Sequence, residues 1–395
     1  MMLTTSFIPP RRVLMGPGPS NVHPRVLQAM ARPTIGHLDP FFVAMMDELK
    51  DLLRYAFQTT NALTLPVSAP GSAGMETCFV NLIEPGDTVI VCQNGVFGGR
   101  MKENILRAGA SVVMVEDEWG TAVDLNKVEE ALKANPAAKA LAFVHAETST
   151  GILSDAKALC ALAVQYGGLS IVDTVTSLGG CPLLVDKWSA DAVYSGSQKC
   201  LSCAPGISPV TFNDKAIEII KARKSPVQSW FMDLTLVMNY WTDGSGAPRA
   251  YHHTAPVNAL YGLHESLVML QEEGHENSWA RHRKNSDALR TGFQAMGLEL
   301  LVSEETHLPQ LATVRVPEDV DSLEVRHRLL NNYDLEVGAG LGDLAGKIWR
   351  IGLMGESSSA AHVILCLSAF EGTLSEMQAP ITKGEAVPAA QEILF

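Results

Sequence analysis

Residues 191–199 read DAVYSGSQK, a short apolar strand that runs into small polar residues and then into a lysine, Lys199. A lysine that only meets solvent has no need to follow a buried strand. A lysine whose amine reacts does, because desolvation lowers the pKa of that amine. Taken alone, the segment fits both interpretations, so the neighbouring sequence has to decide between them.

Strand-like and helix-like segments alternate around this stretch for about 240 residues, which is typical of an α/β fold with a mainly parallel, mixed sheet. Beyond about residue 290 the elements become shorter and indicate a smaller α+β domain. The Pro/Ala-rich end of the chain reads as a mobile tail. We therefore predict an N-terminal arm at 1–22, a large domain at 23–255, a connecting helical region at 256–289, a small C-terminal domain at 290–376 and a tail at 377–395.

The composition excludes several classes of protein. Of 395 residues, 47% are hydrophobic and 18% charged, which fits a folded enzyme or binding protein. The net charge of −13 argues against nucleic-acid or anionic-membrane binding. No signal peptide or membrane-spanning run is readable. The seven cysteines fit reduced thiols in the cytoplasm, and the lone pair Cys200 and Cys203 lacks the second pair that a zinc site needs.

Ligands of open parallel sheets bind beyond the carboxyl ends of the strands. The candidate residues at such ends are Gly71-Ser72-Ala73, Phe97, Glu147-Thr148-Ser149-Thr150, Asp173 and Lys199. Asp173 follows the strand LSIV, so its carboxylate needs a cation or several hydrogen-bond donors, which a pyridinium nitrogen or a helix cap could supply. Together with the amine of Lys199, this set has the parts that hold pyridoxal 5′-phosphate (PLP).

The other members of the set are individually unspecific. Gly71-Ser72-Ala73 opens a helix whose free N–H groups suit a phosphate, although many strand–helix turns contain glycine and serine. Phe97, in the loop after the strand 88–92, can stack on a planar ring, and the Thr148 hydroxyl can contact a ring oxygen. The prediction rests on their joint occurrence in one order along the chain.

Arg350 lies in KIWRIGLM, where Trp349, Ile351 and Leu353 are expected on one face of a strand and Arg350 on the other. An arginine in an apolar strand needs an anionic partner, and a carboxylate matches its two-pronged geometry. The partner is either a carboxylate of the protein or the α-carboxylate of a substrate.

Several long motifs occur in a familiar order: LMGPGPSNVHP (14–24), GHLDPFF (36–42), HAETSTG (145–151), IVDTVTSLGG (171–180), YSGSQK (194–199), YHHTAPV (251–257) and KIWRIGLMG (347–355). On these motifs, the chain resembles the class V, fold-type I PLP-dependent aminotransferases of the alanine–glyoxylate and serine–pyruvate group, over nearly its whole length.

The resemblance implies a role for each matching residue. Lys199 would bind PLP as a Schiff base and act as general base and acid, and Asp173 would pair with the pyridine nitrogen. The remaining implied roles are stacking by Phe97, where relatives often carry tryptophan; contact with the phenolic oxygen by Thr148; phosphate binding by Gly71, Ser72, Ala73 and Gln198; grip on the substrate carboxylate by Arg350; and a place near the substrate for the GPGPS loop with Gly18. The family is dimeric, so Tyr251 and Thr254 would reach the phosphate of a second copy.

The activity that the resemblance implies is ping-pong transfer of the amino group of L-alanine or L-serine to glyoxylate or pyruvate. Alternatives in the same fold are ureidoglycine–glyoxylate, pyridoxamine–pyruvate and 3-hydroxykynurenine transamination. The ureidoglycine branch tends to carry asparagine where this chain has Tyr251. Cysteine desulfurases usually carry histidine at the position of Gln198. A non-catalytic PLP carrier would not need Arg350, and a nucleotide binder fits poorly because the prolines of GPGPS remove backbone donors.

Overall fold

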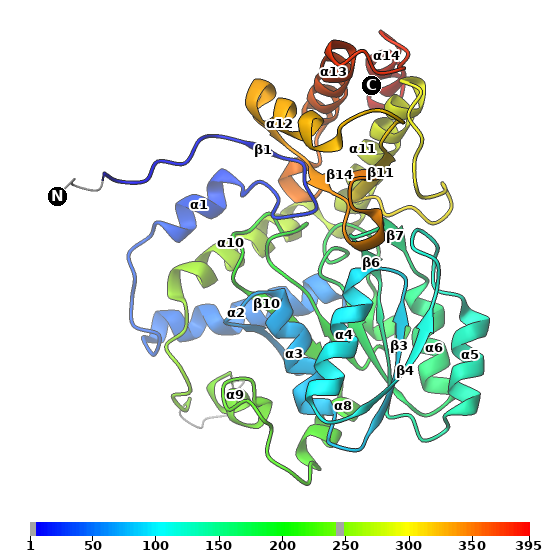
Figure 1. Ribbon diagram of the computed structural model, residues 1–395. Helices are drawn as coiled ribbons and strands as arrows, with labels where there is room; N and C mark the ends of the chain where they lie inside the picture. Colours follow the sequence, from blue (N-terminus) through cyan, green and yellow to red (C-terminus); the bar gives the residue numbers. More distant parts are fainter. Residues whose placement is uncertain (1–4, 242–248) are drawn as a thin grey trace, which may run out of the picture.

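The computed structural model describes residues 5–241 and 249–395, so the first four residues of the predicted arm and seven of the large domain lie outside it. Its centre is a seven-stranded sheet (Figure 1). In spatial order the strands are β2 (Leu63–Val67), β10 (Ser208–Phe212), β9 (Ala192–Tyr194), β8 (Leu169–Asp173), β5 (Ala140–Val144), β3 (Thr88–Gln93) and β4 (Ser111–Glu116). All pairs are parallel except the two that β10 makes, which confirms the predicted mainly parallel, mixed sheet.

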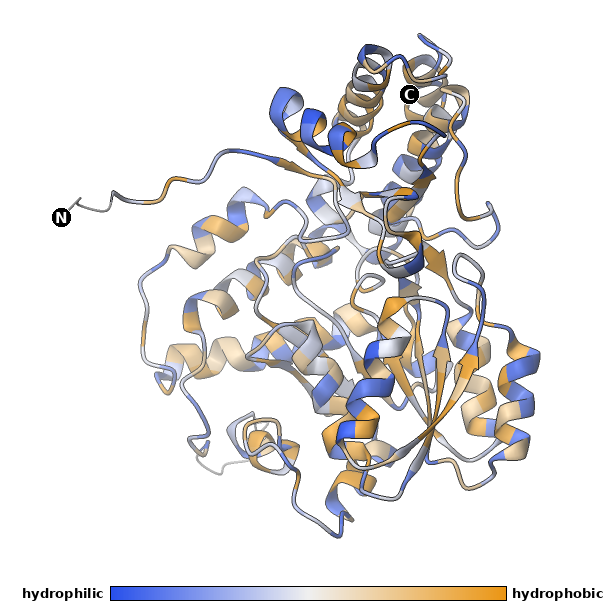
Figure 2. Cartoon of the chain, viewed as in Figure 1, coloured by the Kyte–Doolittle hydropathy of each residue, from blue (hydrophilic) through white to orange (hydrophobic). Residues whose placement is uncertain are grey.

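The sheet is covered by helices on both faces, and in Figure 1 β3 and β4 run between α4 on one side and α5 and α6 on the other. Because both faces are covered, the inner strands are continuous apolar runs, orange in Figure 2, rather than alternating patterns. The helices of this part of the chain are α1 (Pro24–Met30), α2 (Pro40–Phe57), α3 (Gly71–Leu82), α4 (Val96–Arg107), α5 (Leu125–Ala134), α6 (Ala156–Gln165), α7 (Val185–Trp188), α8 (Asp214–Lys221), α9 (Leu234–Tyr240) and α10 (Val257–Glu273).

The register of the sheet fixes where the site forms. Val144, Asp173 and Tyr194 are neighbours across β5, β8 and β9, and each is the last residue of its strand. Parallel strands place these ends at one edge of the sheet. Residues far apart in the sequence therefore meet in one row.

A second apolar core lies in the C-terminal part of the chain. It packs around a three-stranded antiparallel sheet ordered β11 (Leu311–Arg315), β14 (Ile348–Gly352) and β13 (Gly338–Ala339). Trp349, Ile351 and Leu353 point into this core, as their spacing predicts. The remaining elements are β1 (Val13–Leu14), β12 (Leu335–Glu336), β6 (Ala146–Glu147), β7 (Ile152–Leu153), α11 (His275–Ala295), α12 (Ser322–Tyr333), α13 (Ala360–Glu376), α14 (Ala386–Leu394) and the 3-10 helices η1 (Gly342–Leu344) and η2 (Gly355–Ser357).

Two local expectations are wrong. Residues 377–395 do not form a mobile tail, because α14 buries Ala386, Ala390 and Leu394 in the second core and packs on α11. Phe97 is not in a loop, since it lies in the first turn of α4. The predicted domain boundaries stay predictions, although the arm contributes Met15 to the second core and pairs β1 with β12.

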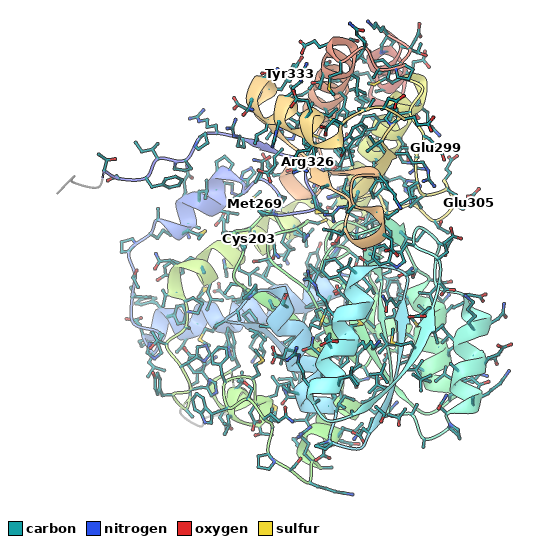
Figure 3. The ribbon with its side chains drawn as sticks, viewed as in Figure 1. Cys203, Met269, Glu299, Glu305, Arg326 and Tyr333 are labelled. Atoms are coloured by element: carbon teal, nitrogen blue, oxygen red, sulfur yellow. The ribbon has the colours of Figure 1, made fainter. Side chains whose placement is uncertain are left out.

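The side chains separate interior from surface in the usual way (Figure 3). Glu299 and Glu305 are exposed, whereas Cys203 is buried. All seven cysteines are buried and free of disulfides. Within the described ranges, no helix is long and apolar enough to cross a membrane, and no cluster of histidine, cysteine, aspartate and glutamate is arranged to hold a metal ion.

Candidate active site

A cavity of about 180 Å³ lies at the carboxyl edge of the large sheet. Its walls come from the segments that follow β2, β3, β5, β8 and β9, as the strand-end argument predicts. Seven of the predicted residues line it: Gly71, Ser72, Phe97, Thr148, Asp173, Gln198 and Lys199. The sequence motifs are thereby brought into one small space.

Lys199 is buried and its amine faces this cavity. Burial, with a smaller contribution from the charge of Arg350, lowers the pKa of Lys199 to about 8. Nζ donates a hydrogen bond to the carbonyl oxygen of Pro17 in the GPGPS loop. A lysine that reaches solvent would show none of this, so the reactive-amine interpretation is the one the geometry favours.

The GPGPS loop packs directly on the lysine. A Cβ added to Gly18 would lie 2.4 Å from Nζ of Lys199, and the φ angle of Gly18 is +105°, which L side chains rarely adopt. This φ angle favours glycine at the position. Gly18 therefore lies beside Lys199, and its place near the substrate stays a prediction.

Asp173 is also buried, and burial raises its pKa to about 6. Two hydrogen bonds oppose this shift: the backbone N–H of Val175 donates to Oδ1 at 2.9 Å, and the Tyr194 hydroxyl donates to Oδ2 at 2.7 Å. Asp173 makes no ion pair with any lysine or arginine of the described residues. A carboxylate in this state favours a cationic partner from a ligand.

The N-terminus of α3 forms one wall of the cavity. Gly71 and Ser72 occupy its first turn, and no side chain caps the helix there. Across from it, the buried Oε1 of Gln198 has no hydrogen-bond partner within the described chain. Free N–H groups at a helix N-terminus, with an uncommitted amide nearby, suit a phosphate. Ala73 follows on the same turn, is buried, and does not line the cavity.

Phe97 is held in place by Glu147, a buried carboxylate. Oε2 of Glu147 accepts a hydrogen bond from the backbone N–H of Phe97 at 3.1 Å, and Oε1 accepts from Ser149. Arg100 places its guanidinium 4.7 Å from the centre of the Phe97 ring. The hydrogen bond to Glu147 holds the backbone of Phe97, and Arg100 contacts its ring. These contacts orient the ring for stacking on a planar ligand.

Arg350 projects from β14 toward the cavity edge. Nε donates to the carbonyl oxygen of Ala339 at 2.6 Å, and Nη1 donates to that of Thr148 at 3.0 Å. It makes no ion pair with a described carboxylate. Burial lowers the pKa of Arg350 to about 10, partly offset by the charge of Glu147. Of the two partners that the sequence left open, the described residues supply no ion-paired protein carboxylate, and a substrate carboxylate stays a prediction.

Tyr251 and Thr254 are not among the residues that line the cavity. Tyr251 is 64% exposed and its ring lies 5.5 Å from that of His37. Thr254 is exposed as well. Their predicted role on a second copy stays a prediction.

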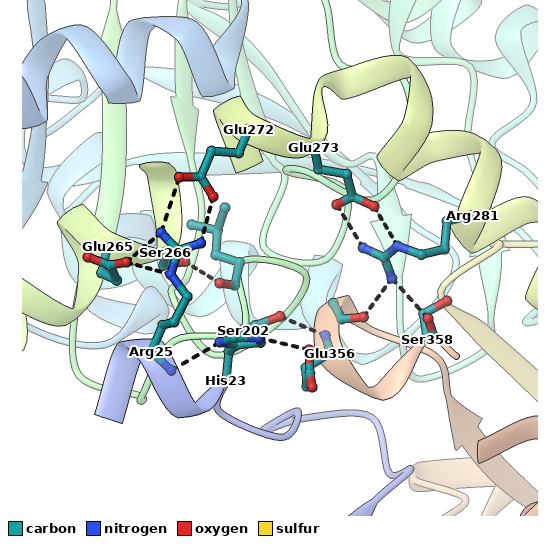
Figure 4. Close-up of polar contacts among 12 residues, drawn as sticks. His23, Arg25, Ser202, Glu265, Ser266, Glu272, Glu273, Arg281, Glu356 and Ser358 are labelled. Atoms are coloured by element: carbon teal, nitrogen blue, oxygen red, sulfur yellow. Dashed lines mark hydrogen bonds and ion pairs between the residues drawn. The ribbon is translucent and has the colours of Figure 1, made fainter. Parts of the chain in front are cut away.

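A larger cavity, of about 580 Å³, lies elsewhere between α1, α10, α11 and the segment after β14 (Figure 4). Its two arginines are already paired with glutamates. Arg25 binds Glu265 and Glu272, and Arg281 binds Glu273. Size alone therefore does not select the site.

The chain was compared with known proteins. The family model for aminotransferase class V matches residues 13–345. The chain belongs to the class V aminotransferases. An alanine–glyoxylate aminotransferase of Oryctolagus cuniculus is 42% identical, over 90% of each chain.

Two solved class V structures are close in fold. The ureidoglycine–glyoxylate aminotransferase from Bacillus subtilis superposes with a TM-score of 0.95 at 38% identity, over 98% of this chain and 99% of that one. The alanine–glyoxylate aminotransferase from Nostoc sp. gives a TM-score of 0.92 at 46% identity, over 94% and 98%. These values show PLP fold type I for this class V chain.

Class V aminotransferases depend on PLP, and the residues present fit that cofactor. Among the described residues, the buried carboxylate of Asp173 makes no ion pair, the α3 N-terminus has no side-chain cap, and Gln198 Oε1 has no hydrogen-bond partner. A pyridinium nitrogen and a phosphate would answer all of these needs at once.

The sequence interpretation gave no role to three residues at this class V site, Tyr194, Glu147 and Arg100, although it placed Glu147 among the residues at the strand ends. Tyr194 looked like one more apolar residue of the strand AVY, and Glu147 like part of a Ser/Thr turn. The signal for Glu147 was available, since a carboxylate between two apolar strands needs hydrogen-bond donors. Tyr194 could be found only from the register that sets it beside Asp173.

Proposed function

We propose that this enzyme transfers the amino group of L-alanine or L-serine to glyoxylate or pyruvate in a ping-pong reaction. One observation carries the proposal: Arg350, a buried guanidinium without a carboxylate partner, lies at the edge of the cavity that holds Lys199. Both an α-amino acid and a 2-oxo acid present a carboxylate beside the reacting carbon. One arginine can therefore orient both substrates in turn.

When bound, PLP supplies an aldehyde for covalent attachment and a ring that takes up negative charge from the reacting carbon. We assign the covalent attachment to Nζ of Lys199 and the pairing with the ring nitrogen to Asp173. Phe97 would stack on the ring, and Thr148 would contact its oxygen. The phosphate is assigned to the wall formed by Gly71, Ser72 and Ala73 with Gln198.

Lys199 also moves the proton. A general base works best when its pKa lies near the working pH, and burial lowers that of Lys199 to about 8. Its amine can therefore accept the α-proton of the amino acid and donate it to the cofactor carbon C4′. Gly18 leaves the space in which the amine moves between these positions.

Transfer from ureidoglycine is the second candidate. It is favoured by the TM-score of 0.95 and the 98% coverage against the ureidoglycine–glyoxylate aminotransferase structure. Tyr251 argues against transfer from ureidoglycine, because the ureidoglycine branch tends to have asparagine at this position. Alanine and serine differ by one hydroxyl, which a weakly discriminating pocket separates by little.

We also propose a homodimer in which Tyr251 and Thr254 complete the phosphate site of the second copy. The exposed aromatic side chains Phe41, Trp230 and Tyr251 support a partner surface in this part of the molecule. Seven free, buried cysteines support a cytoplasmic location. Light scattering tests the assembly, and a monomer with full activity would contradict it.

A donor and acceptor panel tests the reaction. Purified enzyme with PLP is assayed with alanine, serine, ureidoglycine, pyridoxamine and 3-hydroxykynurenine, each against glyoxylate and pyruvate. We expect the highest kcat/KM for alanine or serine with glyoxylate. A higher value for ureidoglycine would replace the first candidate by the second. Binding of PLP without turnover of any donor would leave only a carrier.

A further inference from the structure

Tyr194 makes a contact that an ordinary core tyrosine does not make. It ends β9 and is fully buried, yet it lines the cavity. Its hydroxyl donates to Oδ2 of Asp173 at 2.7 Å. The two residues are register partners in the parallel pair of β8 and β9, so the sheet itself holds them together.

Further contacts hold both residues in place. The backbone N–H of Val175 donates to the other carboxylate oxygen, Oδ1, at 2.9 Å. Thr174 donates twice to the carbonyl oxygen of Tyr194, from its backbone N–H and from its hydroxyl. On the opposite side, a Cβ added to Gly74 would come within 3.3 Å of the Tyr194 Cβ, so α3 packs closely on the tyrosine.

The hydrogen bond between Tyr194 and Asp173 favours the ionised form of the aspartate. Burial and the charge of Asp173 raise the pKa of Tyr194 well above its ordinary value, so the hydroxyl stays a donor at every working pH. A donor favours the ionised form of the carboxylate it binds, and here it opposes the burial that raises the pKa of Asp173. A carboxylate oxygen can accept two hydrogen bonds, so each oxygen of Asp173 keeps one site for a further donor.

We propose that Tyr194 is a positioning residue for transamination, whose hydroxyl orients the Asp173 carboxylate and keeps it ionised for the ring nitrogen of PLP. The inference rests on the role of Asp173 in the proposed function. Tyr194 itself holds no substrate. Its effect reaches the cofactor only through Asp173.

The test is the substitution Y194F, which removes the hydroxyl and keeps the ring in the core. The full-length protein is freed of PLP and titrated with PLP, and the Kd is measured from tryptophan fluorescence. The pH dependence of the visible absorbance of bound PLP, and kcat and KM for the best donor, are measured alongside. The matched control is Y166F, because Tyr166 donates to the carboxylate of Glu129 at 2.8 Å, away from the cavity.

We expect Y194F to raise the Kd of PLP by about 10-fold, since it removes a hydrogen bond to a charged group. The midpoint of the absorbance titration should shift, and kcat should fall by about 10-fold with KM nearly unchanged. Y166F should leave all three readouts at wild-type values. A wild-type Kd together with a wild-type titration midpoint in Y194F would overturn the proposal.

A double-mutant cycle with D173N tests whether Tyr194 acts through Asp173. In the D173N background, Y194F should change the Kd of PLP by less than about twofold, and a full 10-fold effect there would overturn the proposal. If Y194F alone fails to fold, the comparison of Y194F/D173N with D173N still tests the proposal, because D173N removes the buried charge that the phenylalanine would leave unsatisfied and a rise of about 10-fold in the Kd there would overturn it. The Kd and absorbance readouts need no amino donor, so they are independent of which donor the enzyme uses.

Discussion

Two cavities among the described residues both contain charged side chains and differ in how these are paired. The larger one, of about 580 Å³, is lined by arginines and glutamates that neutralise one another (Figure 4). The smaller one, of about 180 Å³, holds Lys199 and Asp173 and borders on Arg350, and none of these three makes an ion pair among the described residues.

The comparison teaches that unsatisfied polarity, rather than volume, marks the reactive site. Burying a charge without a partner is unfavourable, so a fold keeps such groups only where a ligand completes them. The pKa directions agree: burial raises that of Asp173, whereas the hydrogen bond from Arg281 helps to lower that of Glu273.

The largest expected effect comes from K199A. Loss of the amine removes covalent cofactor attachment and the proton carrier together, so transamination should fall by about 10³-fold or more. Borohydride treatment of the wild-type holoenzyme, followed by peptide mapping, should label Lys199 and no residue of the larger cavity. Labelling at another lysine, or activity of K199A above a few per cent, would break the comparison.

A second prediction compares D173N with E273Q. D173N should lower kcat by about 100-fold, because the ring nitrogen loses its anionic partner. The PLP-free protein should nevertheless become more stable near pH 8. The pKa of Asp173 is about 6 in the folded chain against an ordinary 3.8, so its ionisation destabilises the folded state progressively from pH 3.8 to 6 and fully above that. The gain is on the order of 1–3 kcal/mol.

E273Q should act in the opposite direction. The pKa of Glu273 is lowered by Arg281, so its ionised form stabilises the fold above its ordinary pKa, and that stabilisation is lost as pH falls through the lowered pKa. Its loss should cost less than about 1 kcal/mol, with unchanged kcat. Urea unfolding of both PLP-free variants across pH 4–8 measures the two signs. If both substitutions changed the free energy of unfolding in the same direction, the two cavities would not differ in whether their carboxylates are satisfied.

Third, R350K should raise KM for both the amino acid and the 2-oxo acid by about 10-fold, because lysine cannot donate two parallel hydrogen bonds to a carboxylate. The matched variant in the larger cavity is R281K, which should leave KM within about twofold and lower Tm by a few degrees. Steady-state kinetics on both substrates decide. An unchanged KM in R350K would remove Arg350 from substrate binding.

The smallest expected effect concerns pH. Only the neutral amine of Lys199 attacks an aldehyde, and burial lowers its pKa to about 8. The rate at which PLP-free protein takes up PLP should therefore rise about fivefold from pH 7 to pH 8 and level off above pH 9. Stopped-flow absorbance follows the reaction. A rate that kept rising tenfold per pH unit beyond pH 9 would indicate an ordinary, solvated lysine.

Much of the site was predictable because strand ends of a parallel sheet converge. Lys199, Asp173, Thr148 and the Gly71 turn were predicted as polar or glycine positions after apolar runs, and Phe97 was predicted as an aromatic residue after the strand 88–92. The amino-acid sequence could not show the register between strands, and this register makes Tyr194 the partner of Asp173. The pairing of Arg25 with Glu265 spans 240 positions, so the ion pairs of the larger cavity could not be predicted from the sequence either.

The C-terminal segment also shows that the sequence alone does not predict which residues are buried. Its proline and alanine content predicted a mobile tail, yet Ala386 and Ala390 are small enough for α14 to pack closely on α11. Composition reports the average preference of a segment, whereas burial depends on the surface that the rest of the fold offers.

The sequence by itself determined the α/β architecture, the strand ends and the candidates for the reacting groups, because periodicity and turn residues act locally. Only the tertiary structure decided which charges are satisfied. Whether a buried lysine, aspartate or arginine has a partner depends on side chains that come from distant segments, and this pairing separates the cavity built for a ligand from the one that is already complete.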